Sequence, residues 1–370
     1  MQDPQHPHGP AAGPADHDVS RRALIAAGAT VVGAALLRPG EAGGAASADP
    51  ADAPQAVPQD RLFGPPHAHP DRPTCVVALS ETLAVATDEK GRVRAWNVSA
   101  AAVTENLPPF KAKGTKKASY VTASKDLVFS ASYDGIVNVL EQGGMRDWKR
   151  SFDQHGGSPE VWCVAVSDDG TYAASSTNAG EIRRWKTSDA APVGSEFYYT
   201  NDAVGGLAFL PGKTDQILSG HGHGELVWWD LSGATPAVKS VFNHGNSYHV
   251  NSVAVSPNGR YAASGSFDRT MRIWDLTNPA NTTAAHVFAD HADLVWRVAF
   301  SPDNKLVASA SEDGTVRVYR VGGTWEEHAA PRREPGGVMG VAFTPDNKIV
   351  YTAGDKNDPS VRYWPIAGAP

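Results

Sequence analysis

The sequence predicts an all-β fold, a seven-bladed β-propeller of four-stranded antiparallel blades whose ring is closed by an N-terminal strand. A large apolar side chain recurs seven times, at steps of 44 or 45 residues. The 370 residues include 36 Gly and 27 Pro, a density of turn-forming residues that disfavours long helices and suits short strands. Seven repeats of about 45 residues fill almost all of the chain after its first 48 residues, which predicts a single ring.

The repeats share a large apolar marker and, in five of them, a serine ten residues before it. The markers are Trp96, Leu140, Trp185, Trp229, Trp274, Tyr319 and Trp364. The serines are Ser130, Ser175, Ser219, Ser264 and Ser309, with Ala86 in the first repeat and Thr352 in the last. An irregular domain would not repeat this spacing, so each repeat is one structural unit.

Alternating apolar residues flank tight turns within each repeat. Turns of this kind occupy 167–170, 256–259 and 301–304, and β-branched residues stand on both sides of them. Alternation with a period of two predicts antiparallel strands joined by tight turns. Four such strands in about 45 residues make one blade of a propeller.

Two repeats end in a Trp-Asp dipeptide, Trp229-Asp230 and Trp274-Asp275. Together with the marker spacing, these residues resemble the WD40 repeat family. The resemblance implies a propeller that holds protein or peptide partners on one rim, the rim that bears the turns between second and third strands.

The last repeat requires an outer strand from elsewhere, because only six residues follow Trp364. Segment Arg61–Pro66 has suitable apolar content and proline, which outer strands tolerate. We expect it to pair with Val361–Trp364 and close the ring. The propeller then spans 61–370, and 49–60 is a flexible linker.

Residues 1–48 have the pattern of an export signal. Arg21 and Arg22 precede an uncharged run, 23–37, which is shorter than the roughly 20 residues that span a bilayer, and Ala46-Ser47-Ala48 offers a cleavage site. The paired arginines resemble a twin-arginine signal peptide, with an ordinary secretion signal as the alternative. We therefore expect an exported bacterial protein of the periplasm, cell surface or medium, with no integral membrane segment after signal removal.

Charge and cysteine content restrict the partners. A net charge of −7 and a pI near 6.0 argue against nucleic acid, whose phosphates require a basic surface. The two cysteines, Cys75 and Cys163, fall in first strands of different blades, so we expect buried, unpaired thiols. A closed ring has no free sheet edge, and we expect a monomer.

The WD40 resemblance implies a buried hydrogen-bonded set in a blade, made of His, Ser, Asp and the marker. In blade six the matching residues are His291, Ser309 and Asp313, with Tyr319 in the marker position. In blade five they are Ser264, Asp268 and Trp274, with His244 or His249 as the histidine. We expect these sets to be structural rather than hydrolytic triads, because the serine lies within a sheet strand.

Four histidines form the alternative, a metal site. His221 and His223 stand two apart in a Gly-rich turn, and His244 and His249 follow in the next loop. Imidazoles suit copper or zinc, so this cluster could serve a metal-dependent hydrolase or oxidoreductase. The competing interpretation is that His223 replaces the turn aspartate. No Asp, Glu or Cys completes a strong ligand pattern, so we expect no cofactor.

Eight residues are expected on the partner-binding rim. In the turns before the Asp position stand Tyr133, Asn178, Phe267 and Glu312, and at the start of the first strands stand Trp162, Asn251, Trp296 and Met339. Aromatic side chains on loops anchor protein partners. The alternative for Trp162 and Trp296 is burial between blades. The predicted function is a binding scaffold without catalytic residues, with an exported propeller metalloenzyme as the alternative.

Overall fold

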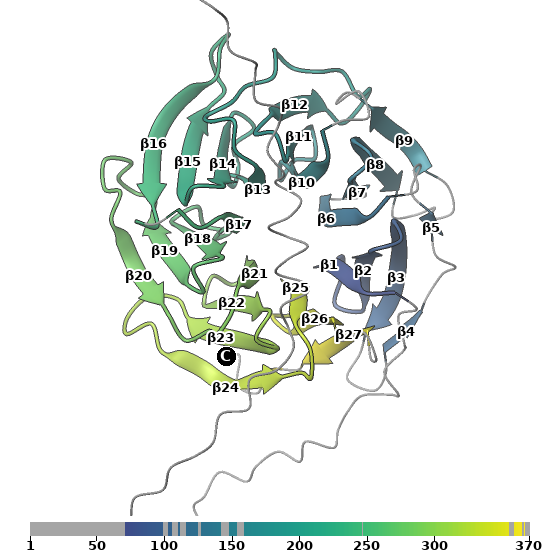
Figure 1. Ribbon diagram of the computed structural model, residues 1–370, viewed down its shortest axis with the longest axis vertical. Helices are drawn as coiled ribbons and strands as arrows, with labels where there is room; N and C mark the ends of the chain where they lie inside the picture. Colours follow the sequence, from purple (N-terminus) through teal and green to yellow (C-terminus); the bar gives the residue numbers. More distant parts are fainter. Residues whose placement is uncertain are drawn as a thin grey trace, which may run out of the picture. The chain divides into compact units, whose positions relative to one another are not determined.

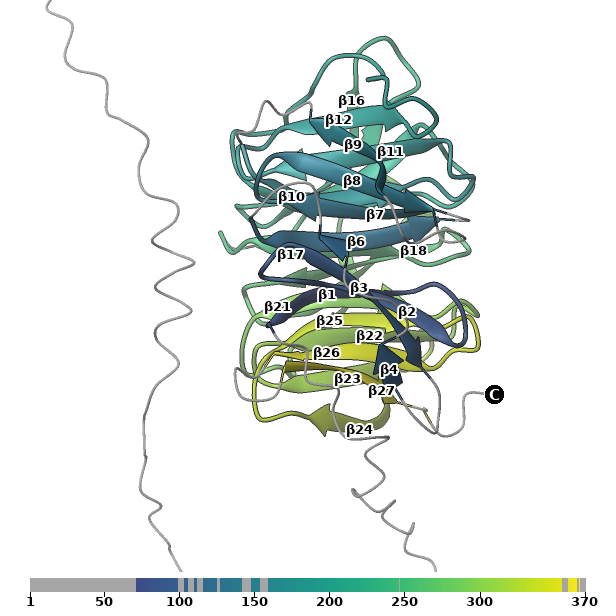
Figure 2. The same cartoon turned by 90° about the vertical axis from the view of Figure 1, so that its right-hand side faces the viewer.

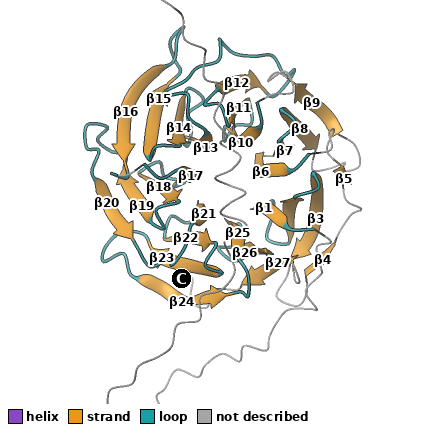
Figure 3. Cartoon of the chain, viewed as in Figure 1, coloured by secondary structure: helices purple, strands orange, loops and turns teal. Residues whose placement is uncertain are grey.

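The computed structural model describes residues 71–98, 103–105, 110–111, 116–124, 127–141, 148–153, 159–245, 247–354, 359–364 and 366. Every described residue belongs to the unit Pro58–Pro370. The regular structure of these residues is entirely β-strand (Figure 3). Among them, no helix is long and apolar enough to cross a membrane. The predicted signal peptide, the linker and the closing strand Arg61–Pro66 lie outside the described residues.

The described strands form seven antiparallel sheets, one for each predicted repeat, which we number as blades one to seven in chain order. Blade one contains β1 (Pro73–Ala78), β2 (Leu83–Asp88), β3 (Arg92–Val98), β4 (Val103–Glu105) and β5 (Phe110–Lys111). Blade two contains β6 (Ala118–Ser124), β7 (Leu127–Ser132), β8 (Ile136–Glu141) and β9 (Trp148–Asp153). Blade three contains β10 (Val161–Val166), β11 (Tyr172–Thr177) and β12 (Ile182–Lys186). Blade four contains β13 (Val204–Phe209), β14 (Gln216–His221), β15 (Glu225–Asp230) and β16 (Ala237–Asn243).

The remaining blades follow the same meander. Blade five contains β17 (Val250–Val255), β18 (Tyr261–Ser266), β19 (Met271–Asp275) and β20 (Ala284–Phe288). Blade six contains β21 (Val295–Phe300), β22 (Leu306–Ser311), β23 (Thr315–Arg320) and β24 (Glu327–Arg333). Blade seven contains β25 (Val338–Phe343), β26 (Ile349–Gly354) and β27 (Pro359–Trp364).

The expectation of four strands in every blade requires correction. In blade one the outer strand is broken into β4 and β5, which both pair with β3. In blade three the chain after β12 makes only two isolated bridges, Ile182 to Phe197 and Trp185 to Pro192. Proline explains both departures, since it donates no ladder hydrogen bond: Pro108 and Pro109 stand between β4 and β5 in the sequence, and Pro192 follows β12. Blade seven shows three strands within the described residues.

The blades are arranged in a ring (Figure 1). The first strand of each blade is innermost and packs against the first strand of the next. The circle runs through β1, β6, β10, β13, β17, β21 and β25, and β25 packs against β1. Figure 2 shows the same ring from its edge.

The core consists of seven apolar clusters among the described residues, each lying between two successive blades. Every marker lies on the third strand of its blade and enters the cluster shared with the preceding blade. This explains the repeat spacing, because one large side chain per blade fills the gap between sheets. Replacing such a buried Trp by Ala costs about 3–5 kcal/mol.

Packing between the last and the first blade closes the circle in the described part of the chain. Trp96 of blade one lies in one cluster with Ala342, Val361 and Tyr363 of blade seven. The predicted pairing of Arg61–Pro66 with the last strand lies outside these residues and stays a prediction.

Candidate partner-binding rim

One end of the blades carries all of the predicted partner-binding residues. In an antiparallel meander, the start of the first strand and the turn between the second and third strands lie at the same end. We name this end of the ring the upper rim. Backbone hydrogen bonds join the two parts, since the residue in the turn donates its N–H to the carbonyl of a residue just before the first strand. These bonds join Tyr133 to Lys117, Asn178 to Glu160, Phe267 to His249 and Glu312 to Leu294, at 2.9–3.1 Å.

Each first strand has a β-bulge at the upper rim. The bulged residues, which have no partner on the second strand, are Thr74, Ser119, Trp162, Gly205, Asn251, Trp296 and Met339. A bulge inserts an extra residue and redirects its side chain. Several of these side chains bond the next blade: Ser119 Oγ donates to the Val161 carbonyl at 2.8 Å, and Asn251 Nδ2 donates to the Trp296 carbonyl at 3.0 Å.

Four rings form a continuous aromatic arc on the upper rim. Trp162 of blade three contacts His249 edge to face, with 5.6 Å between ring centroids. His249 contacts Phe267 at 5.4 Å, and Phe267 contacts Trp296 of blade six at 5.3 Å. Such geometries stabilise aromatic pairs beyond the area that they bury. We name Trp162, His249, Phe267 and Trp296 the aromatic arc.

A carboxylate holds the indole nitrogen at each end of the arc. Trp162 Nε1 donates to Glu160 Oε2 at 3.2 Å, and Trp296 Nε1 donates to Glu312 Oε2 at 2.6 Å. Arg72 of blade one approaches Glu312 at 3.3 Å, and its Nη2 lies 3.7 Å from the sulfur of Met339. Glu312 and Arg72 therefore extend the contacts of the upper rim from Trp296 of blade six to blade one.

The predicted rim residues differ in exposure. Asn251, Trp296 and Met339 are buried, with 4%, 7% and 7% exposed, so they support the surface rather than present themselves on it. A role of these three residues in contacting a partner stays a prediction. Trp162 and Phe267 are half-buried.

The other predicted rim residues remain at the surface. Tyr133 is half-buried, with the Lys117 ammonium 5.5 Å from its ring centroid. Asn178 is exposed and accepts the Glu160 N–H at 3.1 Å. Glu312 is partly exposed at the end of the arc.

Sequence reasoning missed three exposed tyrosines. Tyr198 and Tyr199 precede blade four and Tyr248 precedes blade five, with 46%, 37% and 58% of their surface exposed. Their position just before a first strand was the available signal. His249 was assigned to other sites, although it also precedes a first strand.

The hydrogen-bonded set of blade five is formed as the resemblance implied. Trp274 Nε1 donates to Ser264 Oγ at 2.8 Å, and His244 lies 2.7 Å from the same hydroxyl and 3.1 Å from Asp268. Burial lowers the pKa of His244, so the ring is neutral at pH 7. The Nδ1 proton is therefore donated to Asp268, and Nε2 accepts the Ser264 proton. His244, not His249, is the histidine of this set.

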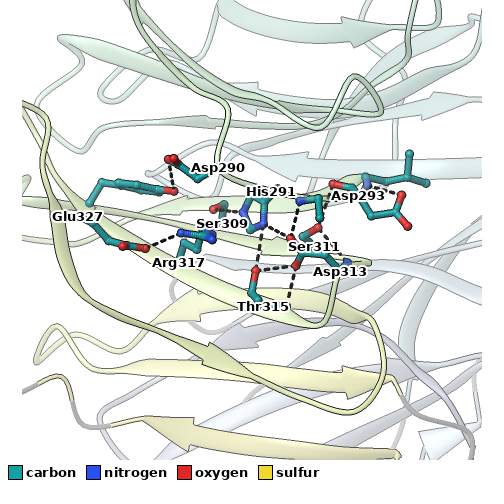
Figure 4. Close-up of polar contacts among 12 residues, drawn as sticks. Asp290, His291, Asp293, Ser309, Ser311, Asp313, Thr315, Arg317 and Glu327 are labelled. Carbon is teal, nitrogen blue, oxygen red and sulfur yellow. Dashed lines mark hydrogen bonds and ion pairs between the residues drawn. The ribbon is translucent and has the colours of Figure 1, made fainter. Parts of the chain in front are cut away.

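Blade six repeats the set with one change (Figure 4). His291 lies 2.7 Å from Ser309 Oγ and 3.0 Å from Asp313. Asp313 also accepts the Thr315 hydroxyl at 2.6 Å, and these hydrogen bonds hold the pKa of that carboxyl below its usual range despite burial. Tyr319 donates to Asp290 at 3.0 Å instead of to the serine, since a phenol extends beyond the position of an indole N–H.

The four histidines of the metal hypothesis have different surroundings. His221 lies 2.7 Å from Ser219, which also accepts the Trp229 indole N–H at 2.8 Å. His223 is hydrogen bonded to Asp202. His244 belongs to the blade-five set, and His249 belongs to the aromatic arc. Within the described ranges, no three His, Cys, Asp or Glu side chains are grouped as a metal would require. The copper or zinc site stays a prediction.

Comparison with known proteins supports a WD40 β-propeller. Residues 147–186, 237–275, 282–320 and 323–364 match the WD40 family, described as WD domain, G-beta repeat. Each matched segment begins at the outer strand of one blade or up to four residues before it, and runs through the inner three strands of the next blade. WD40 repeats are typical of protein-interaction scaffolds.

Two curated relatives match a shorter stretch. The chain is 36% identical over 85 residues to small ribosomal subunit protein RACK1 of Candida albicans and 32% identical over 85 residues to the protein of that name from Dictyostelium discoideum. Each match covers 22% of this chain and 27% or 26% of the relative. The chain thus spans about a quarter of the length of these relatives.

The expected cellular location is corrected by these relatives. Both are named as proteins of the small ribosomal subunit, which is not an exported assembly. The expectation of an exported protein in the periplasm, at the cell surface or in the medium is therefore wrong. The arginine pair and apolar run on which it depended lie outside the described residues.

Proposed function

We propose that this chain is a WD40 propeller scaffold that binds a protein or peptide on its upper rim and performs no catalysis there. The observation that supports the proposal is the aromatic arc, which joins side chains of blades three, five and six into one surface. The partner would contact Trp162 and Phe267, which are partly exposed.

The arc has the physical properties of a binding anchor. Aromatic side chains bury much area and lose little rotamer entropy, so they dominate the free energy of protein recognition. The hydrogen bonds from Trp162 to Glu160 and from Trp296 to Glu312 fix both indoles before a partner arrives. A rigid surface loses less entropy on binding, which favours affinity.

The surroundings of the arc extend the same surface. Tyr198, Tyr199 and Tyr248 are exposed on the upper rim of blades four and five. The relatives from Candida albicans and Dictyostelium discoideum are, by name, components of a ribosomal subunit, and a propeller in such an assembly contacts other macromolecules. The net charge of −7 favours a protein over a nucleic acid as partner of this chain.

No observation favours the alternative of a metalloenzyme. His221 and His244 are hydrogen bonded to blade serines, and His223 to Asp202, so the blades already use these rings. A scaffold role needs no such site.

Binding assays with rim variants test the proposal. A partner that co-purifies with the wild-type protein is measured against Phe267→Ala combined with Trp162→Ala. We expect at least a tenfold loss of affinity, because two anchors disappear. Val238→Ala is the control, since Val238 is an exposed apolar residue that lies on the outer strand β16. The thermal midpoints of the double variant and the control should agree. If they do, an equal loss of affinity in the double variant and in Val238→Ala, or no loss of affinity in either, contradicts the proposal.

A further inference from the structure

One turn on the upper rim has a backbone conformation that its residue does not favour. The turn between the second and third strands of blade five is closed by the Arg269 N–H, which donates to the Ser266 carbonyl at 3.2 Å. Arg269 has a φ of 71°, in the left-handed region. A residue that ends a tight turn between antiparallel strands often has this conformation, which favours glycine because any Cβ crowds the backbone there.

The equivalent residue is glycine in the five other blades whose turn the structure describes. These glycines have φ values of 75–92°, and each donates its N–H to the carbonyl three residues earlier, as Arg269 does: Gly91, Gly135, Gly180, Gly224 and Gly314. The turn of blade five therefore has the same geometry with a residue that is strained in it. Strained residues are concentrated at functional sites. The backbone gives no reason for an arginine at position 269, which leaves its side chain.

The side chain of Arg269 does not stabilise the fold through a polar contact. Arg269 is exposed, and among the described residues its guanidinium has no hydrogen bond or ion pair. The neighbouring carboxylate is used by other groups, since Asp268 Oδ2 lies 3.1 Å from His244 Nδ1 and 3.6 Å from Arg272 Nη2. An exposed guanidinium therefore stands on the same turn as Phe267, a member of the aromatic arc.

Arg269 is the only lysine or arginine in the upper-rim segments of blades three to six. These segments are the four residues before each first strand and the turns between second and third strands, namely 157–160, 178–181, 200–203, 222–224, 246–249, 267–270, 291–294 and 312–314. The same segments contain seven acidic residues, among them Glu160 and Glu312 at the two ends of the arc. Arg269 is thus one positive charge in a mostly acidic part of the rim.

We propose that Arg269 binds a carboxylate of the partner, an aspartate or glutamate side chain that is flanked by neutral or basic residues. The inference rests on the proposed function, since an apolar side chain next to that carboxylate would lie on Phe267 and Trp162. A guanidinium holds a carboxylate with two parallel hydrogen bonds, so Arg269 can fix the register of the partner on the aromatic arc.

The surrounding charges restrict the partner further. A second acidic residue in the partner would approach rim carboxylates such as Glu160 and Asp293 and be repelled, whereas a basic residue would be attracted. A phosphate group is disfavoured, because phosphorylated motifs are recognised by clusters of arginines and Arg269 has no basic neighbour in these segments. The partner segment therefore carries one carboxylate beside an apolar side chain.

A phage-displayed library of random linear peptides is the probe, and it is selected on the wild-type protein. We expect the enriched peptides to contain one Asp or Glu together with an aromatic or aliphatic residue. The most enriched peptide is then synthesised with its acid and, separately, with the matching amide. Wild type should bind the acid form about tenfold more tightly than the amide form, and Arg269→Gly should bind both forms equally.

Three comparisons separate binding from stability. Arg269→Gly should keep the thermal midpoint of wild type or raise it, because glycine adopts this φ more readily. Arg269→Lys keeps the charge without the paired donors, so it should keep part of the preference for the acid form. Arg260→Gln is the matched control, because Arg260 is exposed on the same blade in the turn between the first and second strands, and it should keep the full preference.

An equal preference for the acid form in wild type and Arg269→Gly overturns the inference. So does a midpoint of Arg269→Gly more than about 3 °C below wild type, because the arginine would then stabilise the turn itself. Enriched peptides that lack an acid but lose binding in Phe267→Ala combined with Trp162→Ala overturn the inference and leave the proposed function intact. If wild type enriches no peptide, the proposed function fails together with the inference.

Discussion

His249 lies directly above Gly205, so closely that a Cβ added at position 205 would collide with Cε1 of the imidazole and lie 3.0 Å from the Cα of Asn251. Gly205 is the bulged residue of blade four. Its missing side chain allows His249, which precedes blade five, to reach Trp162 of blade three. Blade seven shows the same relationship, since a Cβ at Gly337 would lie 2.5 Å from Glu312 Oε2. Because Gly205 and Gly337 have no side chain, His249 and Glu312 can lie across these positions.

Gly205→Ala should therefore break the aromatic arc. We expect His249 to be displaced, partner affinity to fall, and the free energy of unfolding to drop by about 1–3 kcal/mol, as for other overpacked sites. Urea denaturation and the binding assay measure both effects. Gly233→Ala is the control, because its nearest atom would lie at an ordinary 3.4 Å, and it should change stability by less than about 0.5 kcal/mol. Identical behaviour of the two variants would show that the space above Gly205 is not used.

Ser264→Ala should destabilise the protein through blade five. The change leaves the Trp274 N–H and His244 Nε2 buried without their shared partner. We expect a loss of about 2–3 kcal/mol in urea denaturation, because unsatisfied buried polar groups are costly. Thr277→Ala, which removes an exposed hydroxyl bonded to Asp275, should cost far less. A neutral Ser264→Ala would mean that the set does not stabilise the blade.

Stability should decrease in mild acid because of His221. Burial lowers the pKa of His221 to about 4 in the folded state, whereas an unfolded histidine titrates near 6.5. Between these two pH values the unfolded chain binds a proton on His221 that the folded protein does not bind. The contribution of neutral His221 to the free energy of unfolding is therefore complete above about pH 6.5 and is lost as the pH falls to 4. The total loss in the free energy of unfolding is about 3 kcal/mol.

Urea denaturation across this pH range measures the effect. His221→Gln should flatten the slope of the unfolding free energy against pH, and Val238→Ala should leave it as in wild type. If His221→Gln keeps the wild-type slope, another group causes the acid sensitivity.

Truncation tests the predicted closing strand. The last matched WD40 segment, 323–364, ends with β27, and the described residues of blade seven form three strands. A chain that starts at His67 should unfold at a lower temperature than one that starts at Arg61, because it lacks the strand predicted to pair with Val361–Trp364. Equal thermal midpoints for the two chains would refute that pairing.

The repeat framework could be predicted from the sequence because it depends on spacing. The markers at steps of 44 or 45 residues occupy third strands, and the serines ten residues earlier occupy second strands. The Ser264 and Ser309 sets followed from the resemblance to the WD40 repeat family. Outer strands were predicted less well, since their proline content is a local feature that breaks pairing in blades one and three.

The site could be predicted only in part, because its contacts cross blades. The sequence indicated Trp162, Phe267, Trp296 and Glu312 as rim residues, but spacing does not reveal that Trp296 is buried while Trp162 is half-buried. It does not reveal that Gly205 makes room for His249.

A photo-crosslinking residue at position 267 tests the central claim most directly. It is placed there in one variant and, for comparison, at Val238, an exposed apolar position on β16 that pairs with Trp229 at the end of the blade opposite the upper rim. The account predicts that irradiation with the partner present yields a covalent complex from position 267 and little from position 238. A complex formed from position 238 and absent from position 267 would contradict it.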